Sequence, residues 1–428
     1  MKMVNLKCDV GMYIEPVVLC AQVASAFYDT GLQSTVKERY ENNQNFTNVD
    51  SQQKAISNFY MVYTMVGKFV PIIPAIILAR CGDRGYRKLP IVVPLIGYFF
   101  ARMFLIFVIM FNWPLEVMYG GAVIHGLCGG FSSYWAGVMA LVSLNTSEEE
   151  RSPRIMRMEL VYGIAGLVGS LASGHLFQLY TVKLKSGVIL VGLSVALYFF
   201  CLFYSTFVLR IARSGGTSER RESVGILERS YRNTTNIALL FAGAILYDIA
   251  VGGGMEILVS YVMKEPLNWD AKQIGYGNAA GFVIFITSFL GVKVFSRCFS
   301  DASLIMIGML SFCAGIYFMA FVTSTYWFYL ARCLMLFALI PMPTIRSVLS
   351  KQVEGSSYGV ILIALQLSFK LVSLAYTPIY TKVYQATLDV FPGFVFTLSS
   401  IITFVAIIPI CIVGCRTAHR AYERIEGN

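Results

Sequence analysis

Apolar stretches of about 20 residues recur along the whole chain, and no other feature restricts its fold as strongly. A stretch of that length crosses a hydrocarbon layer of about 30 Å as a helix. The stretches lack the alternation of apolar and polar residues that is typical of a membrane barrel. We therefore predict an all-α membrane protein with about twelve spans, near residues 13 to 36, 56 to 79, 90 to 111, 116 to 141, 157 to 180, 187 to 210, 236 to 262, 273 to 295, 303 to 322, 326 to 349, 358 to 384 and 393 to 414.

The composition excludes an ordinary soluble protein. Hydrophobic residues make up 57% of the chain and charged residues only 14%, about half the charged share of an average soluble domain. The net charge of +10 could indicate a nucleic-acid partner, but such a partner requires Lys and Arg on one exposed surface. Most of them lie instead in alternate loops, at 1 to 12, 80 to 88, 145 to 157, 210 to 235, 296 to 301, 346 to 356 and 415 to 428. The positive-inside rule then predicts two cytoplasmic termini, with the lipid bilayer and no nucleic acid as partner.

The first span is expected to remain in the protein. The run that begins near residue 13 is long, lacks a small-residue cleavage site and follows a short polar tail, unlike a signal peptide. No cysteine falls in a predicted outside loop, so no structural disulfide is expected. Asn45 heads a glycosylation sequon in the long first outside loop, whereas Asn145 and Asn233 lie on the predicted inner side. We predict that only Asn45 carries sugar.

The chain divides near its middle at its longest polar stretch. Residues 211 to 235 are predicted to form a cytoplasmic linker between two six-helix halves, 1 to 210 and 236 to 414, with a cytoplasmic tail at 415 to 428. The halves share short similarities in the same order, since Tyr28-Asp29 recurs as Tyr247-Asp248, and residues 80 to 83 resemble residues 297 to 301. Such a parallel repeat is typical of the major facilitator fold, whose pseudo-symmetric halves rock about a central site.

The loop between the second and third predicted spans carries a basic signature. Residues 79 to 88 read ARCGDRGYRK and resemble the inner-loop motif of major facilitator transporters. A short basic loop with one carboxylate can hold helix ends in one conformation and release them in the other. We therefore predict a cytoplasmic gate formed by Asp83, Arg84 and Arg87. The alternative is a simple positive-inside loop in which Asp83 caps a helix.

Glu159 lies a few residues into the fifth predicted span. Helical spacing places three small residues after it on one face: Gly163, Gly166 and Ser170. Such a stripe allows another helix to approach closely and directs Glu159 toward the bundle interior. Because an ionisable group at mid-helix costs about 2.5 to 3.5 kcal/mol, Glu159 is a functional candidate, and we predict that it couples transport to protons. The alternative is an ion pair with a neighbouring helix, for example with Arg102 or Lys68.

Three further carboxylates lie well within predicted spans: Asp29, Asp248 and Glu256. The seventh span also contains the triplet Gly252-Gly253-Gly254, which is expected to loosen the helix and expose backbone polar groups to cavity water. We predict that these carboxylates line a substrate cavity together with Tyr28 and Tyr247. The alternative for Asp29 and Asp248 is structural pairing between the halves.

Two arginines, Arg332 and Arg346, lie on the tenth predicted span. Pro341 and Pro343 separate them and are expected to kink this helix. A guanidinium that faces a water-filled pathway is a planar fork for carboxylate or phosphate, so both arginines are predicted to face the substrate cavity. For Arg346, near the predicted cytoplasmic end, snorkelling to the interface is the alternative. The sequence leaves the direction of three further mid-helix cations open: Arg102, Lys68 and Lys370.

No motif for enzymatic chemistry is present, whether metal-ligand spacing, a phosphate loop or a nucleophile elbow. His125 and His175 could relay protons, although a buried and hydrogen-bonded role is expected for each. Tyr28, Tyr247 and Trp135 are candidates for stacking against a flat substrate. We therefore predict a transporter without catalytic residues, metal or cofactor, in which the proton is the coupling ion.

Several longer stretches carry more specific sequence: Glu15 to Val18, Ala55 to Tyr60, Gly129 to Ser132, Pro266 to Trp269, Ile274 to Gly277 and Ile345 to Lys351. They resemble the proton-coupled folate transporter family, solute carrier family 46. Within it, three stretches resemble the thymic stromal cotransporter branch: Gly137 to Leu141, Ser173 to Phe177 and Phe337 to Pro341. The similarity spans nearly the whole chain and is interrupted mainly at the first outside loop and the central linker.

This resemblance implies proton-coupled import of organic anions: folates and antifolates in the best-known branch, with muropeptides or cyclic dinucleotides proposed for others. By position, Glu159 matches the proton-coupling carboxylate of the fifth helix, Asp83 the inner-loop aspartate and Arg346 the tenth-helix arginine. Near Phe282 the folate branch carries a histidine tied to proton coupling, and this chain has no histidine there. The outside cysteine pair of the folate member is also missing, and both departures argue against efficient folate transport.

We expect a symporter, with one chain as the transport unit, that imports a bulky organic anion across the plasma membrane by alternating access. Two alternatives remain: a facilitative carrier without proton coupling, and a membrane scaffold or receptor that has lost transport. The endolysosomal membrane is the alternative location.

Overall fold

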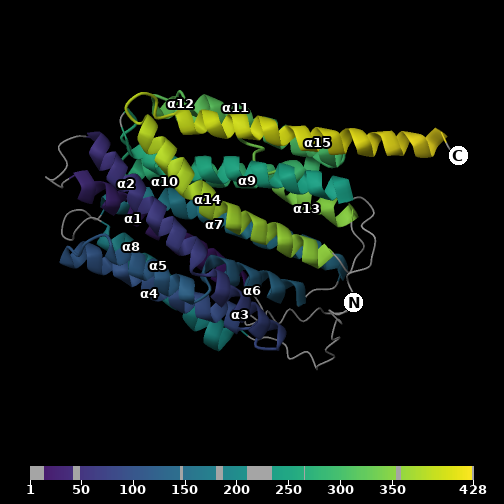
Figure 1. Ribbon diagram of the computed structural model, residues 1–428. Helices are drawn as coiled ribbons and strands as arrows, with labels where there is room; N and C mark the ends of the chain where they lie inside the picture. The colour runs from purple at the N-terminus through teal and green to yellow at the C-terminus, as the bar shows by residue number, and fades with distance from the viewer. Residues whose placement is uncertain are drawn as a thin grey trace, which may run out of the picture. The chain divides into compact units, whose positions relative to one another are not determined.

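The computed structural model describes residues 14–41, 49–144, 148–179, 187–209, 234–264, 266–352 and 358–426, and these ranges contain helices and short connections but no strand (Figure 1). Asn45 and nearly all of the predicted linker 211 to 235 lie outside them. The helices, in chain order, are α1 (Glu15–Glu41), α2 (Val49–Phe69), α3 (Ile72–Asp83), α4 (Leu89–Phe111), α5 (Val117–Leu127), α6 (Gly130–Leu144), α7 (Glu148–Leu179), α8 (Val188–Phe203), the π-helix η2 (Tyr204–Val208), α9 (Thr234–Met263), α10 (Ala271–Phe295), α11 (Asp301–Met319), α12 (Thr325–Leu334), α13 (Pro341–Gln352), α14 (Tyr358–Thr387) and α15 (Phe394–Glu426).

The helices follow the predicted spans closely. In the described ranges, 8 helices are long and apolar enough to cross a membrane. The remaining predicted spans coincide with α1, with α5 and α6 together, with α12 and α13 together, and with α14. The helical fold and its membrane character therefore agree with the sequence, while the count of twelve spans stays a prediction.

The described chain forms two compact units, each with its own packing. Unit 1 comprises residues 1–42, 62–217 and 270–279. In it, α1 packs against α7 and α8, and α4 packs against α5, α6 and α8. Its core is apolar but contains several tyrosines, among them Tyr98, Tyr134 and Tyr198.

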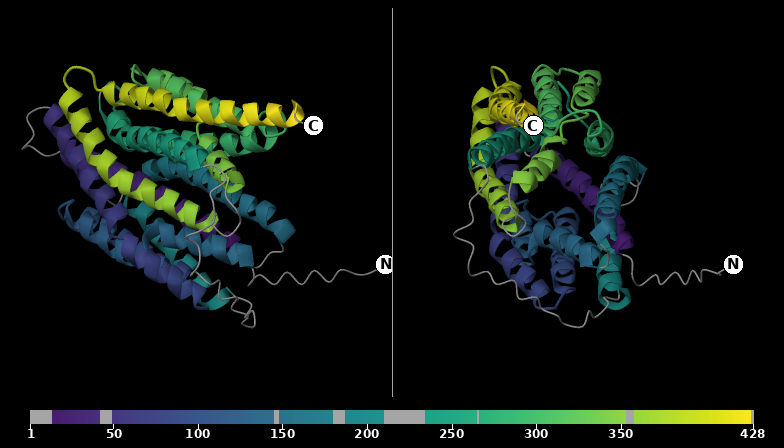
Figure 2. Two further views of the ribbon diagram at one scale, coloured as in Figure 1. Left: turned by 45° about the vertical axis from the view of Figure 1, so that its right-hand side comes forward. Right: turned by 90° about the vertical axis from the view of Figure 1, so that its right-hand side faces the viewer.

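Unit 2 comprises residues 43–61, 218–269 and 280–428. In it, α15 lies along α9 and α11, as the views in Figures 1 and 2 agree, and α14 packs against α9. The glycine triplet of α9, Gly252 to Gly254, lies where α9 packs against α14. A Cβ at Gly252 would lie 2.0 Å from the Tyr376 hydroxyl, and one at Gly253 would lie 2.6 Å from the Tyr380 ring. The prediction that the triplet loosens its helix was therefore wrong, because α9 is continuous and the missing side chains admit two tyrosines of α14.

Three of the predicted spans are interrupted at mid-length, at residues 70–71, 128–129 and 335–340. At the second break Gly129 has a φ of 93°, and a Cβ there would lie 2.6 Å from Leu78 Cδ1, so only glycine fits. The third break precedes Pro341, which is the first residue of α13. The predicted kink is thus displaced toward the N-terminus, because proline is well suited to the first position of a helix, where its missing N–H needs no partner.

Hydroxyl side chains pair the backbone groups that the break at 335–340 releases. Thr287 and Ser288 of α10 donate to the Leu336 carbonyl at 2.7 and 3.0 Å. Ser311 of α11 donates to the Leu334 carbonyl at 2.6 Å, and Tyr247 of α9 donates to the Ala338 carbonyl. Irregular backbone at membrane depth requires such internal partners.

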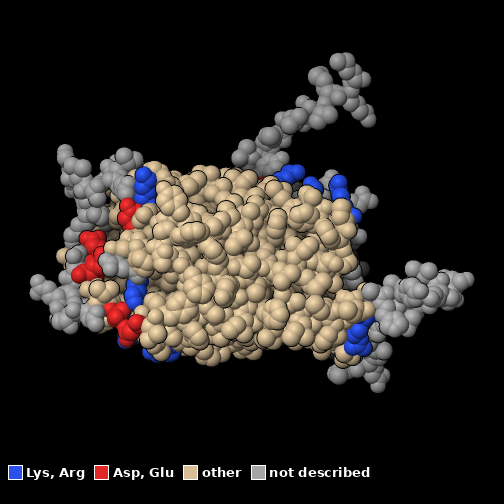
Figure 3. Space-filling model, turned by 90° about the horizontal axis from the view of Figure 1, so that it is seen from above, with Lys and Arg blue, Asp and Glu red and all other residues tan. Residues whose placement is uncertain are grey.

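Charged side chains on the face drawn in Figure 3 gather at two opposite ends and leave a broad area between them without Lys, Arg, Asp or Glu. Large apolar side chains such as Phe69, Phe207 and Phe404 are exposed in the structure. An exposed apolar surface of this kind is expected where lipid covers the protein.

Candidate functional site

A buried arginine lies at the centre of unit 1. Arg102, in the middle of α4, is only 6% exposed. Its guanidinium carbon lies 3.7 Å from the ring centroid of Tyr28, 4.9 Å from that of Tyr98 and 5.8 Å from that of Tyr198. The negative faces of the rings attract the cation and partly replace the water that it has lost. The side chain is therefore held by α1, α4 and α8 together.

Asp29 lies beside this cluster on α1, next to the buried Tyr28, and its side chain is exposed. It attracts Arg102 electrostatically and lies within hydrogen-bonding reach of Ser25. Tyr28 is 1% exposed, and its hydroxyl lies 3.0 Å from that of Tyr63. The predicted cavity pair Tyr28-Asp29 thus consists of a packed ring and an accessible carboxylate.

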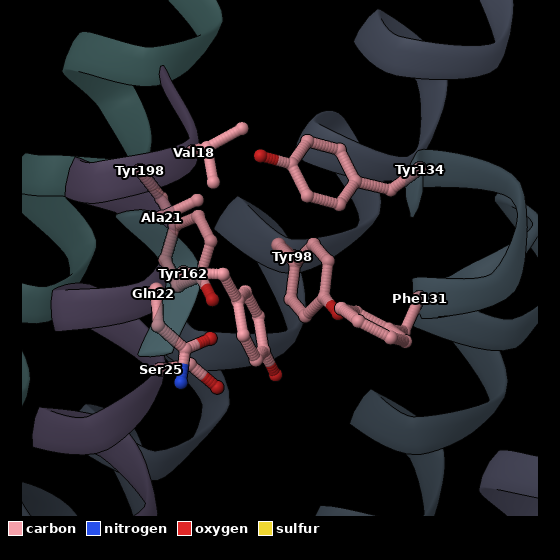
Figure 4. A pocket seen from close by; sticks show the side chains of 9 residues that line it. All are labelled: Val18, Ala21, Gln22, Ser25, Tyr98, Phe131, Tyr134, Tyr162 and Tyr198. Carbon is pink, nitrogen blue, oxygen red and sulfur yellow. The ribbon is translucent and has the colours of Figure 1, made fainter. Parts of the chain in front are cut away.

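A small pocket opens beside the same tyrosines (Figure 4). Its volume is about 40 Å³, and its lining comes from α1, α4, α6, α7 and α8: Val18, Ala21, Gln22, Ser25, Tyr98, Phe131, Tyr134, Tyr162 and Tyr198. Tyr134 points its hydroxyl into this space in Figure 4 and has no hydrogen-bond partner among the described residues. Trp135, a candidate for stacking, does not line the pocket but packs on Phe131 and Tyr162.

Glu159 is half-buried near the start of the membrane part of α7. The three small residues that follow it, Gly163, Gly166 and Ser170, are buried as the stripe predicts. The helix that approaches along this face at Ser170 is α10, because a Cβ at Gly275 would lie 2.7 Å from the Ser170 carbonyl oxygen. Glu159 therefore lies on a helix that makes a close backbone contact further along its length.

The contact between α7 and α10 continues at their neighbouring ends. A Cβ at Gly174 would lie 2.8 Å from Lys272 Cα. His175 Nε2 lies 2.7 Å from the Tyr276 hydroxyl, so this exposed histidine is hydrogen-bonded but not buried. His125 differs, since its ring lies 4.1 Å from that of Tyr98 while its buried Nε2 has no hydrogen-bond partner among the described residues.

The carboxylates predicted in the second half lie in unit 2 on α9. Thr377 of α14 donates a hydrogen bond to Glu256 at 2.7 Å. Asp248 is half-buried, while its neighbour Tyr247 is 1% exposed and bonded to the break at 335–340. Glu256 therefore connects α9 to α14.

The two predicted cavity arginines lie on either side of the break, Arg332 on α12 and Arg346 on α13, and both are half-buried. The Arg332 guanidinium lies 5.3 Å from the Phe328 ring centroid and 3.5 Å from Met255 Sδ. Its Nε has no hydrogen-bond partner among the described residues.

The predicted gate residues lie at the end of α3. Asp83 is the last residue of α3, Arg84 follows it and is exposed, and Arg87 is half-buried. The turn closes through a hydrogen bond of 3.1 Å from Arg84 N to the Arg80 carbonyl and through Gly85, whose φ is 99°. The placement of the Asp83 side chain lies outside what the structure describes, so its latch role stays a prediction.

The sequence analysis named Tyr28 but missed three other tyrosines of this cluster: Tyr98, Tyr134 and Tyr198. Tyr98 and Arg102 are four residues apart, which places both on one face of α4. That spacing was available in the sequence. Tyr134 and Tyr198 carry no comparable local signal, because they join the cluster only through the packing of α6 and α8 on α4.

Known proteins are similar to this chain over most of its length. The model of the Major Facilitator Superfamily matches residues 54–375. Solute carrier family 46 member 2 of Canis lupus familiaris is 44% identical, with 96% of this chain and 95% of the relative covered. The lysosomal proton-coupled steroid conjugate and bile acid symporter SLC46A3 of Homo sapiens is 27% identical, with 91% of this chain and 87% of the relative covered.

Solved structures are similar in fold. A D-xylose-proton symporter has a TM-score of 0.67 at 13% identity, with 93% of this chain and 97% of that chain covered. The human organic anion transporter MFSD10 has a TM-score of 0.62 at 12% identity, with 93% and 98% covered. The predicted major facilitator fold and the resemblance to solute carrier family 46 are thereby confirmed. The chain belongs to solute carrier family 46 of the major facilitator superfamily, a family of multi-pass membrane transporters and not of enzymes.

Proposed function

We propose that this transporter is a symporter that couples the inward movement of a bulky organic anion to protons by alternating access. The solute is folate- or antifolate-like, a muropeptide or a cyclic dinucleotide. The observation that carries the proposal is the half-buried Glu159, on the same helix as the close contact between α7 and α10. A carboxyl group in such a place gains and loses a proton more readily in one conformation than in the other.

The names of relatives support this class of function. SLC46A3 is named a proton-coupled symporter of steroid conjugates and bile acids, and bile acids are bulky anions. Unit 1 contains the cation Arg102 within its helices, and unit 2 contains Arg332 and Arg346.

The test is the variant Glu159→Gln, which keeps the size of a protonated carboxyl group but cannot release a proton. Accumulation of the solute at pH 5.5 should fall to the level seen at pH 7.4, whereas exchange of labelled for unlabelled solute should persist. Both are normalised to protein at the cell surface. Glu116→Gln, at an exposed carboxylate just before α5, is the matched control and should accumulate normally.

The same assay distinguishes a symporter from a facilitative carrier and from a scaffold or receptor. A facilitative carrier would never accumulate solute above equilibrium, with or without Glu159. A scaffold or receptor would show neither accumulation nor exchange. An undiminished pH response in Glu159→Gln would refute the assignment of this residue.

We further propose the plasma membrane as the site of action, with both termini in the cytoplasm. The endolysosomal membrane is the alternative, because SLC46A3 relatives are named lysosomal. An epitope tag at either terminus should be inaccessible to antibody on intact cells and accessible after permeabilisation. Surface biotinylation then decides between the two membranes.

A further inference from the structure

The pocket in unit 1 contains a hydroxyl that lacks a protein partner. Tyr134 lines the pocket (Figure 4), is 3% exposed, and its buried hydroxyl has no hydrogen-bond partner among the described residues. A buried hydroxyl without a partner is unfavourable. A ligand atom that accepts a hydrogen bond from this hydroxyl would supply the missing partner.

A second unsatisfied donor lies directly behind the pocket wall. The Arg102 guanidinium is packed on the rings of Tyr98 and Tyr198, which line the pocket, and its buried Nε has no hydrogen-bond partner among the described residues. The aromatic rings attract its charge but cannot replace oxygen acceptors. A ligand in the pocket would therefore lie close to this cation without touching its Nε.

The charges around the pocket favour a negative ligand. Arg102 is buried, so its field is weakly screened, and the exposed side chain of Asp29 lies beside it. Gln22 at the pocket wall supplies a further amide donor. The pocket thus lies beside a buried cation.

The size of the pocket limits the ligand group. One buried water needs about 10–15 Å³ of such space, so a volume of about 40 Å³ holds roughly three non-hydrogen atoms. A carboxylate has one carbon and two oxygens, which matches this volume. A phosphodiester with its two ester links is larger than this volume.

We propose that this tyrosine pocket is the subsite for a carboxylate of the transported solute, with the Tyr134 hydroxyl as hydrogen-bond donor and Arg102 as the source of positive potential. The proposal rests on the proposed transport of an organic anion and narrows its class to carboxylate-bearing solutes. Asp29 lies at the accessible side of the same cluster and is not a ligand of the carboxylate.

The experiment measures binding separately from transport. Purified full-length protein in detergent micelles is titrated with folate, a muramyl tripeptide, the diamide of folate and a cyclic dinucleotide, and affinity is obtained from the rise in unfolding temperature. The variant is Tyr134→Phe. Because that hydroxyl has no hydrogen-bond partner in the part of the chain that the structure describes, its removal breaks no hydrogen bond there. The matched control is Tyr317→Phe on α11, at an exposed tyrosine outside the pocket.

We expect at least one carboxylate probe to bind wild type and Tyr317→Phe equally and to bind Tyr134→Phe about tenfold more weakly. The diamide and the cyclic dinucleotide should not distinguish Tyr134→Phe from the control. Equal affinity of the carboxylates for both variants, a Tyr134 effect of the same size on the diamide, or no binding of either carboxylate would overturn the subsite.

Uptake of the same probes by cells distinguishes this proposal from the proposed function. Tyr134-dependent binding without any uptake would refute transport and leave the subsite in place. Uptake with binding that does not depend on Tyr134 would refute the subsite alone.

Discussion

The substitution Gly275→Ala should shift the protein away from the conformation in which α7 and α10 touch. An added Cβ would lie 2.7 Å from the Ser170 carbonyl oxygen and 3.1 Å from Gly174 N. Both neighbours are backbone atoms, so the helices must move apart. Overpacking of this kind costs about 1 to 3 kcal/mol. If the contact exists in only one transport state, the equilibrium between the states changes by roughly 5- to 150-fold.

Gly281→Ala provides the control on the same helix, because nothing lies within 4 Å of a Cβ at that position. In a cysteine-depleted background, spin labels at Leu171 of α7 and Lys272 of α10 report the separation of the two helix ends. Gly275→Ala should lengthen the main distance and slow uptake, whereas Gly281→Ala should change neither. If both variants gave the same distance distribution and uptake, the close contact would not differ between transport states and the reasoning would be wrong.

Three further predictions concern other parts of the chain. Asp83→Asn should slow turnover several-fold with nearly unchanged solute affinity, measured as maximal rate against KM, and weaker binding at a normal rate would contradict a gate. Arg346→Lys should weaken binding of the anion about tenfold if a planar fork holds it, whereas equal affinity in a binding assay would leave only a topological role. The Lys264 ammonium lies 2.8 Å from Asp50 and 3.0 Å from the Leu388 carbonyl oxygen, so Lys264→Gln should lower the stability of unit 2 by about 1 kcal/mol. Thermal unfolding at low and high salt checks this last value, since added salt should reduce the difference.

The helices could be predicted from the sequence because lipid imposes one requirement on all of them. A span must be apolar over about 20 residues and must pair its own backbone, and both conditions can be read locally. The break at 335–340 was harder, because its backbone groups are paired by Thr287, Ser288 and Ser311, which lie on other helices. Pro341 indicated that the helix is interrupted, but not whether the interruption lies before or after this residue.

The candidate site could be predicted only in part, because the direction of a side chain depends on the neighbours of its helix. Arg102 was named as a mid-helix cation, yet its tyrosine partners come from α1 and α8 as well as α4. The glycine triplet of α9 shows the same limit. The sequence suggested that the triplet loosens its helix, whereas in the structure it forms the surface against which Tyr376 and Tyr380 pack.

Because hydroxyl groups of other helices pair the backbone of segment 335–340, this segment can act as a hinge between α12 and α13. A serine or threonine hydroxyl can exchange one carbonyl for the next by rotating about a single bond, so the angle between two helix pieces can change without exposing an unpaired group to lipid. Arg332 and Arg346 lie on opposite sides of this hinge. A change of the angle at this segment would therefore move one arginine relative to the other.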